Sequence, residues 1–413
     1  MGETFEIPLD IPGVKIEKVA LNKAGDFIIT VSSTVEGTSC HCCGRQITKP
    51  YGHGQVVTLR HLPILGRRTY LRLRPIRYQC PHCSGGPTTT QKLSWYDPRS
   101  PHTKAYEQHV LFELVNSTVA DVSAKQRLGY EAVMGIIDRH IETKVNWNKL
   151  TALGILGIDE IALRKGHRDF VTIITSRVEG EIRLLAVLPD RKKATVKAFL
   201  SSIPQRLRRT IETLCSDMYD GYVNAAREVF GQRIQIVTDR FHVAKLYRKG
   251  MDELRKQELK RLKQDLPKED YQQLKGAMWA LRKDQAQLSQ EELAVLACLF
   301  ICSPRLKMAY DLCHDLTAIF DDALTRGAAI KKINQWKRRV KRSPVSCFDD
   351  FLTTLDNHLK EIANYFEGRF TSGFVEGFNN KIKVIKRRCY GILNVDHLFQ
   401  RIHLDLMGRT LFA

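Results

Sequence analysis

The sequence has 413 residues, of which 43% are hydrophobic and 27% are charged. This length and composition suit two to four compact domains with buried cores and exclude a chain that is mainly disordered. Lysine and arginine number 65 against 45 acidic residues, so the formal net charge is +20. A charge of this size predicts a polyanionic partner, with nucleic acid as the first candidate.

The first residues carry no signal for export or for lipid attachment. No basic segment followed by an apolar one opens the chain, and position 6 is a glutamate, where a myristoylation signal carries Ser or Thr. The longest nearly apolar run, 293–302, is too short to cross a bilayer and is typical of a buried helix. We therefore expect a cytoplasmic protein with no membrane partner.

Five of the 11 cysteines lie in the first fifth of the chain, where they form two C-x-x-C knuckles at 40–43 and 80–83. Two such knuckles joined by strands deliver four ligands to a tetrahedral Zn²⁺ ion. The absence of a secretory signal favours a reducing compartment and a metal site over disulfides. The predicted zinc ligands are Cys40, Cys43, Cys80 and Cys83, while Cys42, His41, His53 and His82 leave the exact set open.

Residues 1–98 are predicted to form this zinc-binding, β-rich module, because alternating polar and apolar residues, as at 70–74, surround the cysteines. A break at 97–101 separates it from residues 99–150, which are predicted to form a helix-turn-helix DNA-binding domain with helices at 119–124 and 131–141. In the second helix, Arg139 and His140 are candidate base contacts. Three short helices that only pack together would show the same pattern.

From residue 151 the chain changes to short apolar runs bounded by turns. Five of them predict strands of one sheet, at 153–158, 170–175, 182–188, 211–215 and 234–237. The first three are close enough to be antiparallel neighbours, whereas helical sequence separates the later ones, as parallel pairing requires. An all-helical block at 244–370 and a helix at 374–388 follow. The predicted fold class is multidomain α/β, with a mixed sheet and a large all-α insertion.

Three of the five predicted strands are followed within two residues by an aspartate, namely Asp159, Asp217 and Asp239. Side chains at the carboxyl ends of neighbouring strands converge on one surface. Converging carboxylates repel one another, so such a cluster persists when a divalent cation occupies it or a carboxylate takes up a proton. Hard oxygen ligands favour Mg²⁺ or Mn²⁺. A single aspartate here is explained better as a turn or N-cap residue, so the metal interpretation depends on all three together.

Glu376 opens the predicted helix 374–388, between Gly373 and Gly377. A glutamate in a first turn meets the helix dipole favourably, but the two glycines would also let another backbone approach closely. The basic residues behind it are candidate DNA phosphate contacts, namely Lys381, Lys383, Lys386, Arg387 and Arg388. A second basic run, 331–342, is typical of a solvated helix face, although Trp336 within it could stack on an unpaired base.

These motifs together resemble the ISL3 family of insertion-sequence transposases, which are DDE-type enzymes with an RNase H-like catalytic core. The matching segments are GIDE at 157–160, SDM at 216–218, DRFHV at 239–243, VEGFNNKIK at 375–383 and RRCYG at 387–391, with Lys165-Gly166-His167 after the first aspartate. The resemblance spans nearly the whole chain, because the family also carries an N-terminal zinc domain, a helix-turn-helix and a helical insertion before its last glutamate.

The resemblance implies that Asp159, Asp217 and Glu376 form the catalytic triad and hold Mg²⁺ or Mn²⁺. Asp239 and His242 match the D-x-x-H signature of related transposases, which gives them supporting roles. Asp239 also competes with Asp217 for the second position of the triad. The implied catalytic core comprises 151–243 and 371–413, interrupted by the helical insertion 244–370.

The implied function is that of a DNA transposase that binds the terminal inverted repeats of an insertion sequence and catalyses metal-dependent strand cleavage and strand transfer. Two metal ions would support in-line attack on a phosphodiester. Its partners would be double-stranded DNA, at the element ends and in the target, and further copies of itself, because two ends must meet. The expected location is the bacterial nucleoid. The alternative is a non-catalytic, sequence-specific DNA-binding protein derived from a transposase.

Overall fold

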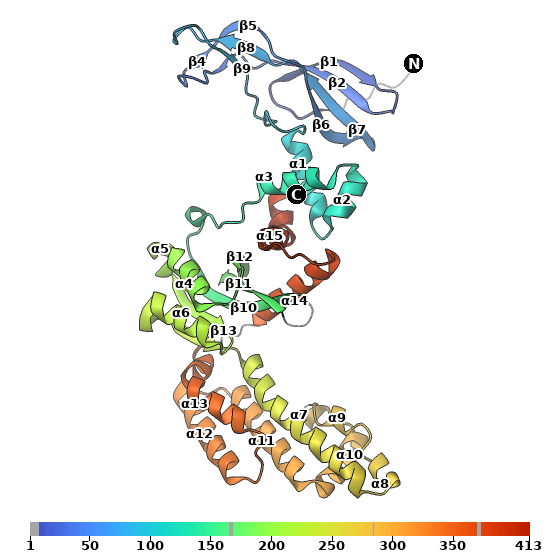
Figure 1. The fold of residues 1–413 in the computed structure, drawn as a ribbon, viewed down its shortest axis with the longest axis vertical. Coiled ribbons are helices and arrows are strands. Elements are labelled where there is room, and N and C mark those ends of the chain that lie inside the picture. The colour runs from blue at the N-terminus through green and yellow to red at the C-terminus, as the bar shows by residue number, and fades with distance from the viewer. Residues whose placement is uncertain (1–7, 165–167, 284, 370–372) are drawn as a thin grey trace. The chain divides into compact units, whose positions relative to one another are not determined.

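The computed structural model describes residues 8–164, 168–283, 285–369 and 373–413, without the side chains of Arg168 and of 373–376. The predicted motif Lys165-Gly166-His167 therefore lies outside the described residues. The chain forms two compact units, one of Met1–Glu142 with Gln400–Ala413 and one of Thr143–Phe399 (Figure 1). Each unit has its own buried apolar residues, so each is described by itself.

The first part of the N-terminal unit is built of short strands. Its largest sheet has the order β1-β2-β7-β6, in which β2 and β7 are parallel and the other neighbours antiparallel. Leu59 and Leu71 are fully buried at its core. The strands are β1 (Val14–Leu21), β2 (Phe27–Ser33), β3 (Thr38–Ser39), β4 (Gln46–Ile47), β5 (Lys49–His53), β6 (Val57–Ile64), β7 (Arg67–Leu73), β8 (Ile76–Gln79) and β9 (Thr88–Thr90). The predicted β-rich character of this region is confirmed.

Three helices follow, α1 (Lys104–Leu114), α2 (Val119–Gln126) and α3 (Tyr130–His140). Thr118 begins α2 as its N-cap, since its Oγ1 accepts the Asp121 N–H at 3.0 Å. Arg127 ends α2 in the left-handed region, with φ of 49°, and so turns the chain into α3. The helix pair predicted at 119–124 and 131–141 is confirmed.

The end of the last helix, α15 (Val395–Phe412), belongs to this helical core. Leu404 is fully buried among residues of α1, α2 and α3. Arg401 donates from Nη2 to the carbonyl oxygens of Leu114 (3.1 Å) and Ser117 (2.8 Å), and Asp405 accepts the Asn116 N–H at 3.0 Å. These contacts correct the predicted core segment 371–413, because Gln400–Ala413 pack in the N-terminal unit.

The second unit contains the five-stranded sheet, with the order β12-β11-β10-β13-β14. Its strands are β10 (Gly154–Arg164), β11 (Arg168–Val178), β12 (Glu181–Leu188), β13 (Ile211–Ser216) and β14 (Gln235–Thr238). The pairs β10·β11 and β11·β12 are antiparallel, and β10·β13 and β13·β14 are parallel, as predicted. Pro204 divides the helical sequence between β12 and β13 into α4 (Lys193–Ser202) and α5 (Gln205–Arg208), and α6 (Asp220–Phe230) follows β13.

The predicted helical block after the sheet is also confirmed (Figure 1). It comprises α7 (Arg240–Asp265), α8 (Lys268–Gln272), α9 (Ala277–Ala280), α10 (Gln290–Cys302), α11 (Pro304–Asp321), α12 (Arg326–Arg342) and α13 (Asp349–Ala363). Asn364 ties its end to the sheet by donating from Nδ2 to the Ile236 carbonyl at 2.8 Å. The helix α14 (Gly373–Arg388) then contacts β10. Within the described residues, no helix combines the length and apolar character that a membrane span requires.

We expect Leu404→Ala to destabilise the helical part of the N-terminal unit by about 2–5 kcal/mol, because it opens a cavity among α1, α2 and α3. Hydrogen exchange across 104–140, measured by mass spectrometry, should accelerate. Leu411→Ala, at an exposed position of the same helix, is the control. Unchanged protection in the Leu404 variant would show that the C-terminal segment does not stabilise this core.

Candidate functional site

Four cysteines from the two predicted knuckles come together beside β3 and β8. The Sγ atoms of Cys40 and Cys83 lie 4.0 Å apart, and those of Cys43 and Cys80 lie 3.8 Å apart. All four sulfur atoms lie within 4.8 Å of one another. A tetrahedral Zn²⁺ ion with thiolate bonds near 2.3 Å places its sulfur ligands about 3.8 Å apart. The four thiols are therefore arranged to hold one such ion.

A second group that meets the same distance limit consists of Cys40, His41 and Cys42. The His41 ring is already engaged, because its Nδ1 lies 2.9 Å from Thr89 Oγ1 and its Nε2 lies 3.2 Å from Cys42 Sγ. Neither His53 nor His82 belongs to such a group among the described residues. The backbone N–H groups of Cys43 and Cys42 lower the pKa of the Cys40 thiol to about 6, which favours the thiolate that zinc requires.

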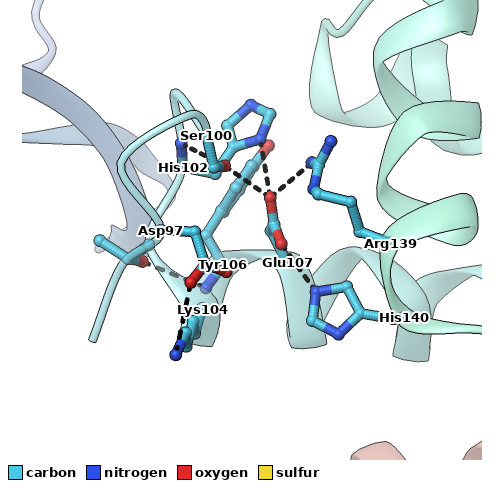
Figure 2. Close-up of polar contacts among 9 residues, drawn as sticks. Asp97, Ser100, His102, Lys104, Tyr106, Glu107, Arg139 and His140 are labelled. Atoms are coloured by element: carbon cyan, nitrogen blue, oxygen red, sulfur yellow. Dashed lines mark hydrogen bonds and ion pairs between the residues drawn. The ribbon is translucent and has the colours of Figure 1, made fainter. Parts of the chain in front are cut away.

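A buried carboxylate links the helices of the predicted DNA-binding domain (Figure 2). Glu107 of α1 is 1% exposed and accepts from Ser100 Oγ (2.6 Å), Arg139 Nη2 (2.6 Å) and His140 Nε2 (2.7 Å), with His102 Nδ1 at 3.6 Å. Burial opposes its charge, but these donors prevail and hold the pKa of Glu107 well below its usual range. Arg139 and His140 therefore attach α3 to α1, and their predicted contact with DNA bases stays a prediction.

The prediction that Trp336 stacks on a base is wrong. Its ring is 2% exposed and lies 5.7 Å from the Phe348 ring, and its Nε1 donates to the Leu312 carbonyl at 2.8 Å. Three neighbouring basic residues form ion pairs within the helical block, Lys332 with Asp322, Lys337 with Asp356 and Arg339 with Asp315. The periodicity of α12 thus places its tryptophan in the core.

The five basic residues predicted to contact DNA from α14 occupy two different environments. Lys386 donates from Nζ to the carbonyl oxygens of Ala162 and Leu163, and burial lowers its pKa. It therefore attaches α14 to β10, which corrects its assignment as a phosphate contact. The side chains of Lys381, Lys383 and Arg387 are exposed, and Arg388 is half-buried.

Two of the predicted acidic residues lie on adjacent strands. The parallel register of β10 and β13 pairs Gly157 with Cys215, so Asp159 and Asp217 each follow this pair by two residues. Both side chains are partly buried. Burial raises the pKa of Asp159 to about 6, and the negative charge of Asp217 contributes to that rise. Burial also raises the pKa of Asp217.

Neighbouring N–H groups fix the orientation of these two carboxylates. Asp159 Oδ1 accepts the Glu160 N–H at 2.7 Å, and its Oδ2 accepts from Asn379 Nδ2 of α14. Asp217 Oδ1 accepts the Tyr219 N–H at 3.1 Å. Each acid therefore has a defined rotamer before any ligand binds.

Asp239 has a different position. It follows β14, which is separated from β10 by β13, and it is 3% exposed. Its Oδ1 accepts the Phe241 N–H at 3.1 Å, so it is the N-cap of α7. One turn into that helix, His242 borders a surface hollow together with Asp217. Glu376 lies in the first turn of α14, and its side chain is outside the described part of the chain.

An ion pair next to the acids escaped the sequence-based prediction. Arg191 Nη1 lies 3.1 Å from Glu160 Oε2, and its guanidinium lies 4.9 Å from the ring centre of Phe170 and 5.4 Å from that of Tyr219. Its positive charge opposes the rise in the pKa of Asp217. No motif separates Arg191 from the other arginines of the sequence, so only the fold identifies it.

We expect Cys43→Ser to lose bound zinc and Cys42→Ser to keep one zinc ion per chain, because only Cys43 belongs to the four-sulfur cluster. Metal content of the purified proteins, measured by mass spectrometry, checks this. The reverse result would assign the metal to the group of Cys40, His41 and Cys42.

We expect Glu107→Gln to destabilise the three-helix region by about 3 kcal/mol at neutral pH, because it removes one partner of a buried ion-pair cluster. The pKa of Glu107 is lower in the folded state, so its stabilisation is complete above the unfolded value near 4.5 and declines as the pH falls below it. The protection of 104–140 from hydrogen exchange should thus differ most at neutral pH. Glu131→Gln, at an exposed position of α3, is the control, and equal protection in both variants would refute the role of Glu107.

Three family models match segments of the chain that include the residues discussed above. The model for DDE transposases of family ISL3, described as a transposase, matches residues 156–402. The model for the helix-turn-helix domain of transposase family ISL3 matches 91–141, and the zinc-finger model of the transposases IS204/IS1001/IS1096/IS1165 matches 36–83. The zinc-finger match and the four-cysteine cluster together support a structural zinc ion.

Individual relatives agree with the family models. The transposase for insertion sequence element IS1001 of Bordetella parapertussis is 27% identical over 384 residues, which cover 92% of this chain and 92% of its own. The transposase for insertion sequence element IS1557 of Mycobacterium tuberculosis is 24% identical over 389 residues, which cover 89% of this chain and 86% of its own. The DDE transposase model matches more than half of the residues of this chain. The chain therefore belongs to the ISL3 family of DDE-type transposases.

Proposed function

We propose that the protein cleaves DNA at the ends of an insertion sequence and joins those ends to target DNA, in a catalytic site formed by Asp159, Asp217 and Glu376. The observation that carries the proposal is that Asp159 of β10 and Asp217, the first residue after the parallel neighbour β13, each come two residues after the paired Gly157 and Cys215. Burial raises the pKa of both carboxyl groups, and the negative charge of Asp217 raises that of Asp159 further. An aspartate that serves only as a turn or N-cap residue would not require a second carboxylate on the neighbouring strand.

An RNase H-like core is part of this proposal. Numbered along the chain, the five strands of the sheet lie in the order 3-2-1-4-5, with the first three antiparallel and the last two parallel to the first. The fourth strand thus lies beside the first, and each leads to one of the two acids. The residues between the fifth strand and α14 form the helical insertion.

The place of Glu376 is supported by the attachment of α14 to β10. Asn379 donates to Asp159, and two turns later Lys386 donates to the Ala162 and Leu163 carbonyls. Glu376 precedes Asn379 by three residues, which is about one helical turn. The same helix therefore carries the third acid and a residue in contact with the first.

The donor atoms suit Mg²⁺ or Mn²⁺. Asp159 and Asp217 supply carboxylate oxygens, and the buried Oδ1 of Asn379 has no hydrogen-bond partner within the described chain. When bound, the cation would supply Lewis acidity to a phosphodiester and lower the pKa of an attacking water or DNA 3′-hydroxyl. Asp239 supports the site indirectly, because it caps the helix that carries His242.

Cationic side chains surround the acidic residues and suit a DNA backbone. The hollow beside Asp217 and His242 is also lined by Lys245, Lys249 and His358. Lys381, Lys383 and Arg387 of α14, the helix whose Asn379 contacts Asp159, are exposed. Charges of this sign neutralise phosphates and release their counterions. They are therefore suited to hold DNA across a site that is itself acidic.

The other parts of the chain would bring DNA ends to this site. We assign 1–98 to zinc-stabilised end binding, 99–150 to helix-turn-helix recognition, 151–243 with 371–399 to catalysis and 244–370 to the helical insertion. Because two ends must be joined, the working form is an oligomer of this chain on double-stranded DNA. This substrate places the protein at the nucleoid, in the cytoplasm.

We expect Asp217→Asn to keep DNA binding and to lose Mg²⁺- or Mn²⁺-dependent cutting of labelled element ends by more than the roughly 100-fold that loss of a residue behind a metal ligand typically costs. Glu212→Gln, at an exposed position of the same strand, is the matched control and should cut normally. Binding and cutting are measured in the same reactions.

Asp239→Asn separates the two candidates for the second acid, because asparagine caps a helix as well as aspartate does. This variant should retain cutting if Asp239 acts mainly as a cap. Loss of cutting in Asp239→Asn with normal cutting in Asp217→Asn would reassign the second catalytic position. Binding without cutting by the wild type would favour the alternative, a DNA-binding protein derived from a transposase.

A further inference from the structure

Asn379 differs from the other polar residues of α14 whose side chains are described, because its own side chain is almost completely removed from solvent. It is 5% exposed. Its Nδ2 donates to Asp159 Oδ2, which joins two residues 220 positions apart in the sequence. Its Oδ1 is buried and has no hydrogen-bond partner in the described part of the chain. The amide therefore uses one of its two ends on a catalytic acid and leaves the other unsatisfied.

An unsatisfied buried carbonyl oxygen is costly. Its loss of hydration is not compensated when no partner replaces the water molecules. Rotating the amide by 180° would not remove the cost, because it would place Oδ1 against the ionised oxygen of Asp159 and leave the two N–H groups unpaired. The hydrogen bond to Asp159 thus fixes which end of the amide is left free.

The position of Asn379 is set by the protein scaffold. Seven residues further along α14, Lys386 donates to the carbonyl oxygens of Ala162 and Leu163 of β10. Between them, Ile382 is fully buried. These three residues recur at helical spacing and define the face of α14 that packs toward the sheet. Asn379 is therefore held beside Asp159 in the absence of DNA.

We propose that Asn379 is a metal-site residue with two functions, which rests on the proposed catalytic role of Asp159 and Asp217. Its Nδ2 holds Asp159 in position, and its Oδ1 supplies a neutral oxygen ligand to the divalent cation. Amide carbonyls are ordinary ligands of hard cations, and a neutral ligand adds no repulsion to a group of carboxylates. This role explains why the buried Oδ1 of Asn379, next to Asp159, has no hydrogen-bond partner among the described residues.

The test measures metal binding directly. Mn²⁺ binding to the full-length, zinc-loaded protein is titrated by electron paramagnetic resonance, and cutting of labelled element ends is measured against Mn²⁺ concentration. Asn379→Ala is compared with Asn379→Asp, which keeps an oxygen ligand and loses the N–H donor. Asn380→Ala, at the exposed neighbouring position, is the matched control. Circular dichroism, thermal melting and DNA binding are recorded for all variants.

We expect Asn379→Ala to weaken Mn²⁺ binding by about 10- to 100-fold and to raise the Mn²⁺ concentration for half-maximal cutting by a similar factor, with DNA binding unchanged. Asn379→Asp should bind Mn²⁺ more tightly than Asn379→Ala, because a carboxylate oxygen replaces the amide oxygen. Asn380→Ala should behave as the wild type.

Two outcomes overturn the proposal. If Asn379→Ala binds Mn²⁺ as the wild type does, neither function exists. If Asn379→Asp binds no better than Asn379→Ala, Oδ1 is not a ligand. The comparison with Asn379→Asp still tests the Oδ1 ligand when the alanine variant melts early, because aspartate preserves the volume of the side chain.

Asp217→Asn is measured in parallel to keep the two proposals apart. Normal cutting by Asp217→Asn rejects the proposed catalytic site itself. If Asp217→Asn loses cutting while Asn379→Ala binds Mn²⁺ as the wild type does, only the role of Asn379 is rejected.

Discussion

The parallel pairing of β10 with β13 is the constraint on which the catalytic unit depends. Parallel neighbours cannot be joined by a tight turn, so β11, β12, α4 and α5 lie between them in the chain. The resulting register brings Asp159 and Asp217 to the same end of the sheet. Two acids in that position repel each other. The charge of Arg191 partly offsets the negative charge of Asp217, and the hydrogen bond from Asn379 orients Asp159.

The excess of positive charge does not by itself locate a DNA-binding surface. Along α12, three cations are paired with aspartates of the helical block, and Arg139 and His140 are engaged with a buried glutamate. On α14, Lys386 is used on backbone carbonyls, while Lys381, Lys383 and Arg387 are exposed. How much of a basic side chain stays exposed depends on the fold, and residue counts do not reveal it.

Local patterns predicted what depends on nearby residues. Apolar periodicity predicts all five strands of the five-stranded sheet and the two helices of the helix-turn-helix. Each of these elements is short and turns its apolar residues toward the core, so the pattern can be read from the segment alone. The roles of Trp336, Glu107 and Gln400–Ala413 depend on partners far away in the sequence. The pairing of cysteines at 40–43 and 80–83 is long-range too, but the C-x-x-C spacing identified it because metal chemistry restricts the ligand types.

The two faces of α14 have different surroundings. Asn379, Ile382 and Lys386 face the sheet, whereas Lys381, Lys383 and Arg387 are exposed. A helix is stiff over this length, so the exposed lysines are held at a fixed distance from Asp159, which the inner face contacts. Changing the spacing of the motif by one residue would rotate the lysines by about 100° relative to the acid. The motif is therefore constrained by its geometry on the helix as much as by its chemistry.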